Sequence, residues 1–188
     1  MNVTLFGGAF DPPHLGHQAI AIELVAQQLA DEVWFLPVKM HAFEKDLSSE
    51  VHRLAMLELL QIPHTRVELA ELEQTTTNYT YQTLTALAAK YPEHTFNFVI
   101  GSDNLKKFHL WDEYQKLITE FPFFVYPRAG YLLDPLYRNM KVIPKVQPVL
   151  VSSTQVRECV AAGKSISDLV HPFVERYIQN NNLYVKRT

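Results

Sequence analysis

The feature that most constrains the fold is a regular alternation of short apolar runs with longer helical patterns. Runs typical of buried strands lie at Val3–Phe6, Glu32–Leu36, Arg66–Leu69, Phe96–Ile100, Phe123–Tyr126 and Val149–Val151. Helical patterns lie between and after them, at Leu15–Ala30, Ser49–Leu60, Thr80–Lys90, Asn104–Phe108, Trp111–Leu117, Thr154–Ala162 and Pro172–Asn180. Alternating strands and helices favour parallel pairing through right-handed crossovers. We therefore expect an α/β fold with a doubly wound, mostly parallel sheet, whose ligand lies beyond the carboxyl ends of the strands.

Chain length and helix-capping residues support this division. A chain of 188 residues suits a single domain over 1–188 with one sizeable core. Ser49 is expected to cap the second helix, with Glu50 in its first turn. Ser153 is expected to cap the sixth helical segment, and Gly163 to end it.

Composition excludes several classes of protein. Hydrophobic residues make up 47% of the chain and the formal net charge is −3, which is not the balance of a general nucleic-acid binder. Cys159 is the single cysteine, so no disulfide forms within the chain, and its position in a helical pattern favours a packing thiol. No signal-like leader precedes the first strand, and no apolar run approaches the ~20 residues of a membrane helix. We expect a soluble cytoplasmic protein with no membrane or nucleic-acid partner; a monomer and a homo-oligomer are both compatible with these features.

The segment 7–17, Gly-Gly-Ala-Phe-Asp-Pro-Pro-His-Leu-Gly-His, joins the first strand to the first helix. Its glycines let backbone N–H groups approach a ligand, and the helix N-terminus adds donors and a partial positive charge. His14 and His17 are three residues apart and share one helix face, so both imidazoles can donate to phosphate oxygens. A zinc pair is the alternative, but apart from Asp11 it lacks nearby partners at ligand spacing, so we expect no metal bound by the protein alone.

A second polar segment, Val151-Ser-Ser-Thr-Gln-Val-Arg157, opens a later helix. Its hydroxyls and backbone donors at a helix N-terminus, with Arg157 one turn along, suit a triphosphate. Together with His-Leu-Gly-His, the segment resembles the two signatures of the nucleotidyltransferase superfamily related to class I aminoacyl-tRNA synthetases. The resemblance implies a Rossmann-like nucleotidyltransferase fold.

Further segments are similar to those of bacterial nicotinate mononucleotide adenylyltransferases. The similar stretches are Asn78–Leu84, the Gly-Ser-Asp-Asn-Leu run at 101–105 followed by Trp111, Arg128-Ala-Gly130, and the ending with Tyr177, Ile178, Leu183 and Tyr184. The resemblance covers nearly the whole chain in order. It implies transfer of AMP from ATP to nicotinate mononucleotide, with release of pyrophosphate and formation of deamido-NAD.

The resemblance also implies roles for individual residues. Catalysis is expected from His14, His17 and Arg157. ATP binding is expected from Gly7, Gly8, Ala9, Phe10, Gly101, Asp103, Ser152, Ser153 and Thr154. Acceptor binding is expected from Lys39, Lys45, Asn78, Tyr79, Thr80, Trp111 and Arg128. Trp111 also has a structural interpretation, because a tryptophan between helical segments is often part of the core.

An acceptor phosphate is already ionised at neutral pH, so the reaction needs positioning and charge stabilisation rather than a general base. Mg²⁺ is expected to be carried mainly by ATP.

Two alternative functions stay open: a transferase for nicotinamide mononucleotide or pantetheine phosphate, and a nucleotide sensor without turnover. The short chain and its second motif argue against a class I synthetase.

Two positions depart from the family pattern. Ala9 replaces the commoner Thr or Ser of the phosphate loop, and Val38–Lys45 stands where the family shows Pro-Pro-His-Lys. Lysines remain in this second segment, so we expect Lys39 or Lys45, and Lys45 in particular, to contact ligand phosphate.

Overall fold

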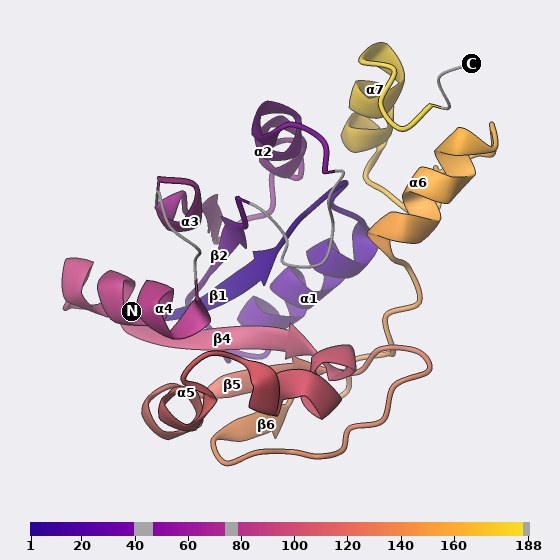
Figure 1. Cartoon of the computed structure of the whole chain (residues 1–188). Coiled ribbons are helices and arrows are strands. Elements are labelled where there is room, and N and C mark those ends of the chain that lie inside the picture. Colours follow the sequence, from indigo (N-terminus) through magenta and orange to yellow (C-terminus); the bar gives the residue numbers. More distant parts are fainter. Residues whose placement is uncertain (40–46, 74–78, 186–188) are drawn as a thin grey trace.

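The computed structural model describes residues 1–39, 47–73 and 79–185. One sheet runs through the molecule, with the order β3-β2-β1-β4-β5-β6 and parallel pairing at every strand pair (Figure 1). Its strands are β1 (Asn2–Gly8), β2 (Glu32–Pro37), β3 (Thr65–Val67), β4 (Thr95–Gly101), β5 (Phe123–Tyr126) and β6 (Met140–Val142). The expected doubly wound parallel sheet is confirmed. The strand order reverses between β1 and β4, so a crevice at their carboxyl ends is the place where such sheets bind ligands.

Helices cover both faces of the sheet (Figure 1). They are α1 (Leu15–Ala26), α2 (Glu50–Glu58), α3 (Ala70–Glu73), α4 (Thr80–Lys90), the 3₁₀ helix η1 (Ser102–Leu110), α5 (Tyr114–Glu120), α6 (Ser153–Ala161) and α7 (Pro172–Asn180). The two-residue period of the strands builds the two cores: Leu5 and Phe123 face one side, and Phe6 and Phe124 face the other. The core on the Phe6 side takes side chains from α1, α2, α6 and α7, whereas the other core takes them from α4, η1 and α5.

Three of the expected elements need correction. The strand expected at Val149–Val151 is wrong: Val149 makes only an isolated parallel bridge to Arg128, and the sixth strand is β6. The first helix ends at Ala26 rather than Ala30, because Gln28 adopts a positive φ of 56°, which ends helical hydrogen bonding. The first of the two short helices after β4 is a 3₁₀ helix, and α3 was not expected at all.

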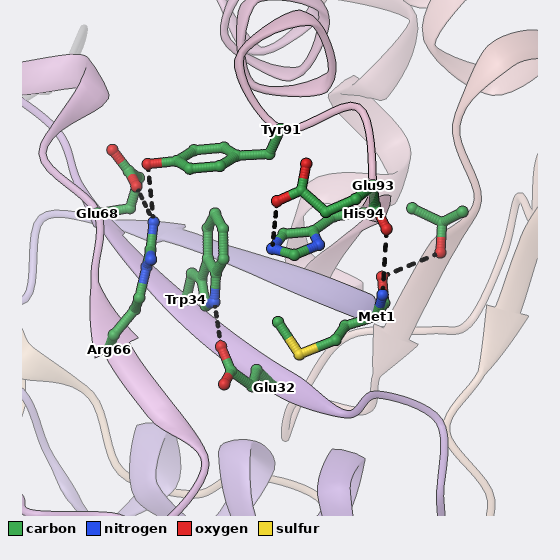
Figure 2. Close-up of polar contacts among 9 residues, drawn as sticks. Met1, Glu32, Trp34, Arg66, Glu68, Tyr91, Glu93 and His94 are labelled. Carbon is green, nitrogen blue, oxygen red and sulfur yellow. Dashed lines mark hydrogen bonds and ion pairs between the residues drawn. The ribbon is translucent and has the colours of Figure 1, made fainter.

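The edge strand β3 has only three residues, and a stack of side chains secures it (Figure 2). The guanidinium carbon of Arg66 lies 3.5 Å from the ring centroid of the buried Trp34 on β2. Arg66 also donates to the carboxylate of Glu68 at 2.6 Å and to the hydroxyl of Tyr91 at 3.1 Å. These contacts tie the edge of the sheet to the end of α4.

No helix among the described residues is long and apolar enough to span a bilayer. Cys159 lies on α6, partly buried against the core on the Phe6 side, as expected of a packing thiol.

Candidate active site

The loop between β1 and α1, residues 9–14, occupies the carboxyl end of the central strand beside β4. Gly7 and Gly8 come directly before it. A Cβ on Gly7 would lie 2.7 Å from the Phe98 ring, and a Cβ on Gly8 would lie 3.2 Å from the Phe10 ring. The two glycines therefore have a packing role: they allow aromatic rings to close against the backbone where the loop begins.

His14 and His17 form a stacked pair at the N-terminus of α1. Their ring centroids are 3.6 Å apart and their planes differ by 18°. His14 is the N-cap residue, with an extended backbone, and its N–H donates to Nδ1 of His17 at 3.1 Å. Because Nδ1 of His17 accepts this hydrogen bond, the neutral ring carries its proton on Nε2. His17 therefore has Nε2–H left as a donor.

Burial keeps both rings neutral. Burial, followed by the nearby charge of Arg128, lowers the pKa of His14 to about 3. Burial, followed by the repulsion that a proton on His14 would exert and by the charge of Arg128, lowers the pKa of His17 well below its usual value. His14 is 4% exposed, and its Nδ1 has no hydrogen-bond partner among the described residues. Edge contacts from Phe10, with centroids 4.9 Å apart, help to hold the His17 ring.

The Ser-Ser-Thr segment at 152–154 contacts the loop between β1 and α1, which is called the first loop below. Ser153 Oγ donates to the carbonyl of Pro12 at 2.9 Å, and Arg157 Nη1 donates to the carbonyl of Asp11 at 2.7 Å. Arg157 also donates to Thr154 at 3.3 Å. The expected N-cap Ser153 is wrong by one residue: Ser152 caps α6 by accepting from the N–H of Gln155 at 3.1 Å. Tertiary folding thus joins the two motifs, which are about 140 residues apart in sequence.

A third group follows β4 and β5. The Arg128 guanidinium lies 3.4 Å from the Asp103 carboxylate, and the Arg128 N–H donates to Ser102 Oγ at 2.9 Å. A Cβ on Gly101 would lie 2.3 Å from Asp103 and 2.8 Å from Arg128, so glycine is required for this approach. Burial raises the pKa of the adjacent Tyr126 to about 12. Arg128 reaches the histidine pair electrostatically, because its charge lowers both imidazole pKa values.

The structure places the remaining residues expected on the acceptor side on separate elements. Tyr79 is the N-cap residue of α4 and is 43% exposed, and Thr80 is the first residue of that helix. Trp111 packs against Phe108, with ring centroids 4.9 Å apart, which matches its structural interpretation. Lys39 is exposed just after β2. Lys45 and Asn78 lie outside the described residues.

Two buried residues of charged type, which were not expected in the site, hydrogen-bond to or within the loop of residues 9–14. Asp11 is 1% exposed and accepts from the N–H of Ser48 at 3.0 Å. Arg53 is also 1% exposed, and it donates to the carbonyls of Ala9 at 2.7 Å and Ser48 at 3.2 Å. A sequence signal for Arg53 exists: it shares the helical stripe of Met56 and Leu57, where an arginine is unusual.

Comparisons with known proteins agree with this geometry. The model of the cytidylyltransferase-like family matches residues 5–159. A probable nicotinate-nucleotide adenylyltransferase of Halalkalibacterium halodurans is 37% identical over 97% of this chain and 91% of its own length. The nicotinate-nucleotide adenylyltransferase of Bacillus subtilis is 32% identical over 97% of this chain and 98% of its own.

A solved structure gives the same result. The nicotinic acid mononucleotide adenylyltransferase of Plasmodium falciparum, complexed with NaAD, superposes with a TM-score of 0.82 and 25% identity, covering 97% of each chain. The family model spans most of the chain, and curated relatives above 30% identity span nearly all of it. The chain therefore belongs to the cytidylyltransferase-like family and, within it, to the nicotinate-nucleotide adenylyltransferases.

Proposed function

We propose that this protein transfers the adenylyl group of ATP to nicotinate mononucleotide, which releases pyrophosphate and forms deamido-NAD. The observation that carries the proposal is the stacked pair of neutral histidines at the N-terminus of α1, at the point where the strand order reverses. The curated relatives are nicotinate-nucleotide adenylyltransferases, and the similar solved structure is complexed with NaAD. The family model and the nearly full coverage by relatives support a single nucleotidyltransferase domain over residues 1–188.

The proposed reaction is an in-line displacement. A phosphate oxygen of the acceptor forms a bond to the α-phosphorus of ATP, the bond from that phosphorus to the bridging oxygen breaks, and pyrophosphate leaves with the electron pair. Nε2–H of His17 is a neutral donor already aimed by the hydrogen bond at Nδ1, so it stabilises charge that develops on the α-phosphate. His14 and the partial positive charge at the N-terminus of α1 add to this stabilisation.

The remaining residues are proposed to bind the two substrates. On the ATP side the first loop, with Gly7, Gly8, Ala9 and Phe10, would hold phosphate, and Gly101 and Asp103 would hold the ribose. Ser152, Ser153, Thr154 and Arg157 would surround the adenine and triphosphate. On the acceptor side, Asn78, Tyr79, Thr80, Trp111 and Arg128 would form the pyridine and phosphate pocket, with Lys39 or Lys45.

Mg²⁺ is proposed to reach the site bound mainly to the phosphate oxygens of ATP, where it neutralises their charge. The donor set of the loop fits this arrangement. Asp11 is the single carboxylate in residues 7–17, and its two oxygens already accept hydrogen bonds from Ser48 and Tyr184. What the segment offers a ligand is N–H groups and imidazoles, which suit phosphate better than Mg²⁺, because this cation prefers oxygen ligands.

A coupled assay of pyrophosphate release tests the proposal. Purified protein is given ATP and Mg²⁺ with one of three acceptors: nicotinate mononucleotide, nicotinamide mononucleotide or pantetheine phosphate. We expect the highest kcat/KM with nicotinate mononucleotide, formation of deamido-NAD, and loss of turnover when EDTA removes the metal. Turnover of pantetheine phosphate in place of the nicotinate acceptor would contradict the acceptor assignment. ATP binding without turnover of any acceptor would identify a sensor instead.

A further inference from the structure

Tyr184, near the C-terminal end of the described residues, is hydrogen-bonded to the loop of residues 9–14 that leads into the histidine pair. After α7 the chain turns back, and the hydroxyl of Tyr184 donates to Oδ1 of Asp11 at 2.5 Å across 173 positions of sequence. Tyr184 and Asn182 both have positive φ, 62° and 49°, conformations that non-glycine residues adopt at a cost of about 1 kcal/mol or more. The turn is therefore held by contacts that offset this cost, and the hydrogen bond to Asp11 is one of them.

Asp11 connects this turn to the rest of the loop. Its carboxylate is buried, with Oδ1 taken by Tyr184 and Oδ2 by the N–H of Ser48. Its backbone carbonyl accepts from Arg157 at 2.7 Å. Removing one of the two donors would leave a buried carboxylate oxygen without a hydrogen bond, which costs free energy. The position of Asp11 therefore depends on both donors. The residue is thus fixed from the segment just before α2, from α6 and from the C-terminal turn.

The neighbours of Asp11 lead directly to the reacting groups. Phe10, on one side, has a positive φ of 50° and lays its ring edge against His17. His14 follows three residues later and stacks on His17. A shift of Asp11 therefore moves a ring that supports His17 and the backbone that carries His14. Misplacement by about 1 Å of groups that position a substrate can lower a rate about 100-fold.

The Tyr184 hydroxyl is suited to a fixed role as donor. Burial, followed by the neighbouring Asp11 carboxylate, raises the pKa of Tyr184 far above its ordinary value of 10.0. The phenol therefore keeps its proton throughout the working pH range, and the hydrogen bond to Asp11 has one direction only.

We propose that Tyr184 is a positioning residue of the nucleotide site: through the carboxylate of Asp11 it holds the loop that presents His14 and His17 to the ATP phosphates. This inference rests on the proposed function for its substrate, because it assumes that the loop binds ATP. It assigns a task to Tyr184, which lies outside the catalytic and binding residues named above.

The first test compares two phenylalanine variants that each lose one hydroxyl near the C-terminus. Tyr184→Phe removes the donor to Asp11. Tyr177→Phe is the matched control, because its hydroxyl pairs with Nδ1 of His52 at 3.0 Å and does not touch the loop. Binding of a non-hydrolysable ATP analogue is measured by isothermal titration calorimetry, and kcat and KM are measured for adenylyl transfer. We expect Tyr184→Phe to raise the Kd of the analogue about fivefold and to lower kcat/KM for ATP about tenfold, with Tyr177→Phe within twofold of wild type.

The second test asks whether Tyr184 acts through Asp11. Asp11→Ala removes the acceptor and is expected to show at least the kinetic defect of Tyr184→Phe. The double variant is expected to be no worse than Asp11→Ala alone, since both changes break one connection. Additive defects would overturn the proposal. It would also be overturned if Tyr184→Phe lowered the Tm but bound the analogue with wild-type Kd, because the hydroxyl would then serve stability alone.

The binding measurement separates this inference from the proposed function. If wild-type protein binds the analogue but turns over no nicotinate mononucleotide, the proposed function fails, while the Kd comparison between Tyr184→Phe and Tyr177→Phe still decides the inference.

Discussion

At the scale of single residues, the distinctive feature of this site is that its two histidines are neutral and differently engaged. His17 has one nitrogen committed to the backbone of His14 and the other left as a donor. Neutral donors attract phosphate less strongly in the ground state than an imidazolium would. Their hydrogen bonds to the α-phosphate strengthen as negative charge accumulates on it. Such groups act more on kcat than on substrate affinity.

His17→Ala tests this division. We expect kcat to fall by about 10²–10³, as when one donor of an oxyanion site is removed, while the KM for ATP changes much less. The variant should remain folded, because His17 is partly exposed and its neighbours Phe6 and Phe10 still pack on each other. Steady-state kinetics and circular dichroism make the measurement, with the exposed His109→Ala as a matched control. Nearly full activity in His17→Ala would remove the residue from the mechanism.

At the scale of elements, the start of α1 is packed so closely that one glycine decides its geometry. A Cβ on Gly16 would lie 2.5 Å from Cγ1 of Val149 and 3.0 Å from the imidazole of His14. Val149 has a stiff, β-branched side chain, so the strain falls partly on the His14 ring. Val149, in the segment expected as a strand, thus packs instead against the start of α1, next to the histidine pair.

Gly16→Ala should therefore impair catalysis as well as stability. We expect a destabilisation of about 1–3 kcal/mol from overpacking, together with a fall in kcat of about tenfold or more. Gly163→Ala is the control, because Gly163 has φ +66° after α6 and open space around it. That change should cost about 1 kcal/mol through backbone strain and leave kcat unchanged. Equal kinetics in both variants would show that packing at Gly16 does not reach His14.

The segment after β2 carries a prediction about charge. Pro37 ends the strand as the sequence indicates, and Lys39 is exposed two residues later. We expect Lys39→Ala or Lys45→Ala, and Lys45→Ala in particular, to raise the KM for ATP or for the acceptor, with a smaller effect at high salt because ions screen an exposed charge. Unchanged KM and kcat in both single variants and in the double variant would rule this role out.

At the scale of the whole molecule, two buried groups give stability opposite pH dependences. His14 has its pKa lowered from 6.5 to about 3, so between these values the unfolded chain binds a proton that the folded chain does not, and the free energy of unfolding falls as pH falls. Burial raises the pKa of Glu71 from 4.5 to about 7, despite a hydrogen bond from Thr83. Between those values the folded chain holds the extra proton, and the free energy of unfolding falls as pH rises.

Urea unfolding from pH 5 to pH 8, at fixed ionic strength, measures both contributions. Relative to wild type, His14→Asn should lose about 1–2 kcal/mol less stability on going from pH 7 to pH 5. Glu71→Gln should lose about 2–3 kcal/mol less on going from pH 5 to pH 8. Parallel pH profiles for wild type and either variant would mean that the group in question does not titrate as its burial implies.

The sequence by itself determined the first five strands, the longer helices between them and the two motifs, because each depends on patterns within about 15 residues. Their alternation was enough to predict the parallel sheet. Thr80–Lys90 and Pro172–Asn180 begin and end where hydrophobic periodicity and capping residues indicate. The same local rules failed at Val149–Val151, whose β-branched residues look like a strand, and at Met140–Val142, whose pairing to β5 makes a strand that its pattern barely indicates.

Tertiary structure alone decided which groups surround the histidines. The contacts of Asp11 with Ser48, Arg157 and Tyr184 span 37, 146 and 173 positions, and no periodicity within an element specifies such pairs. They form because the carboxyl ends of parallel strands gather distant loops at one edge, where a buried carboxylate must find donors from whichever segments arrive. Burial shifted the pKa values of His14, His17 and Glu71 for the same reason, since desolvation depends on the packed neighbours and not on the residue type.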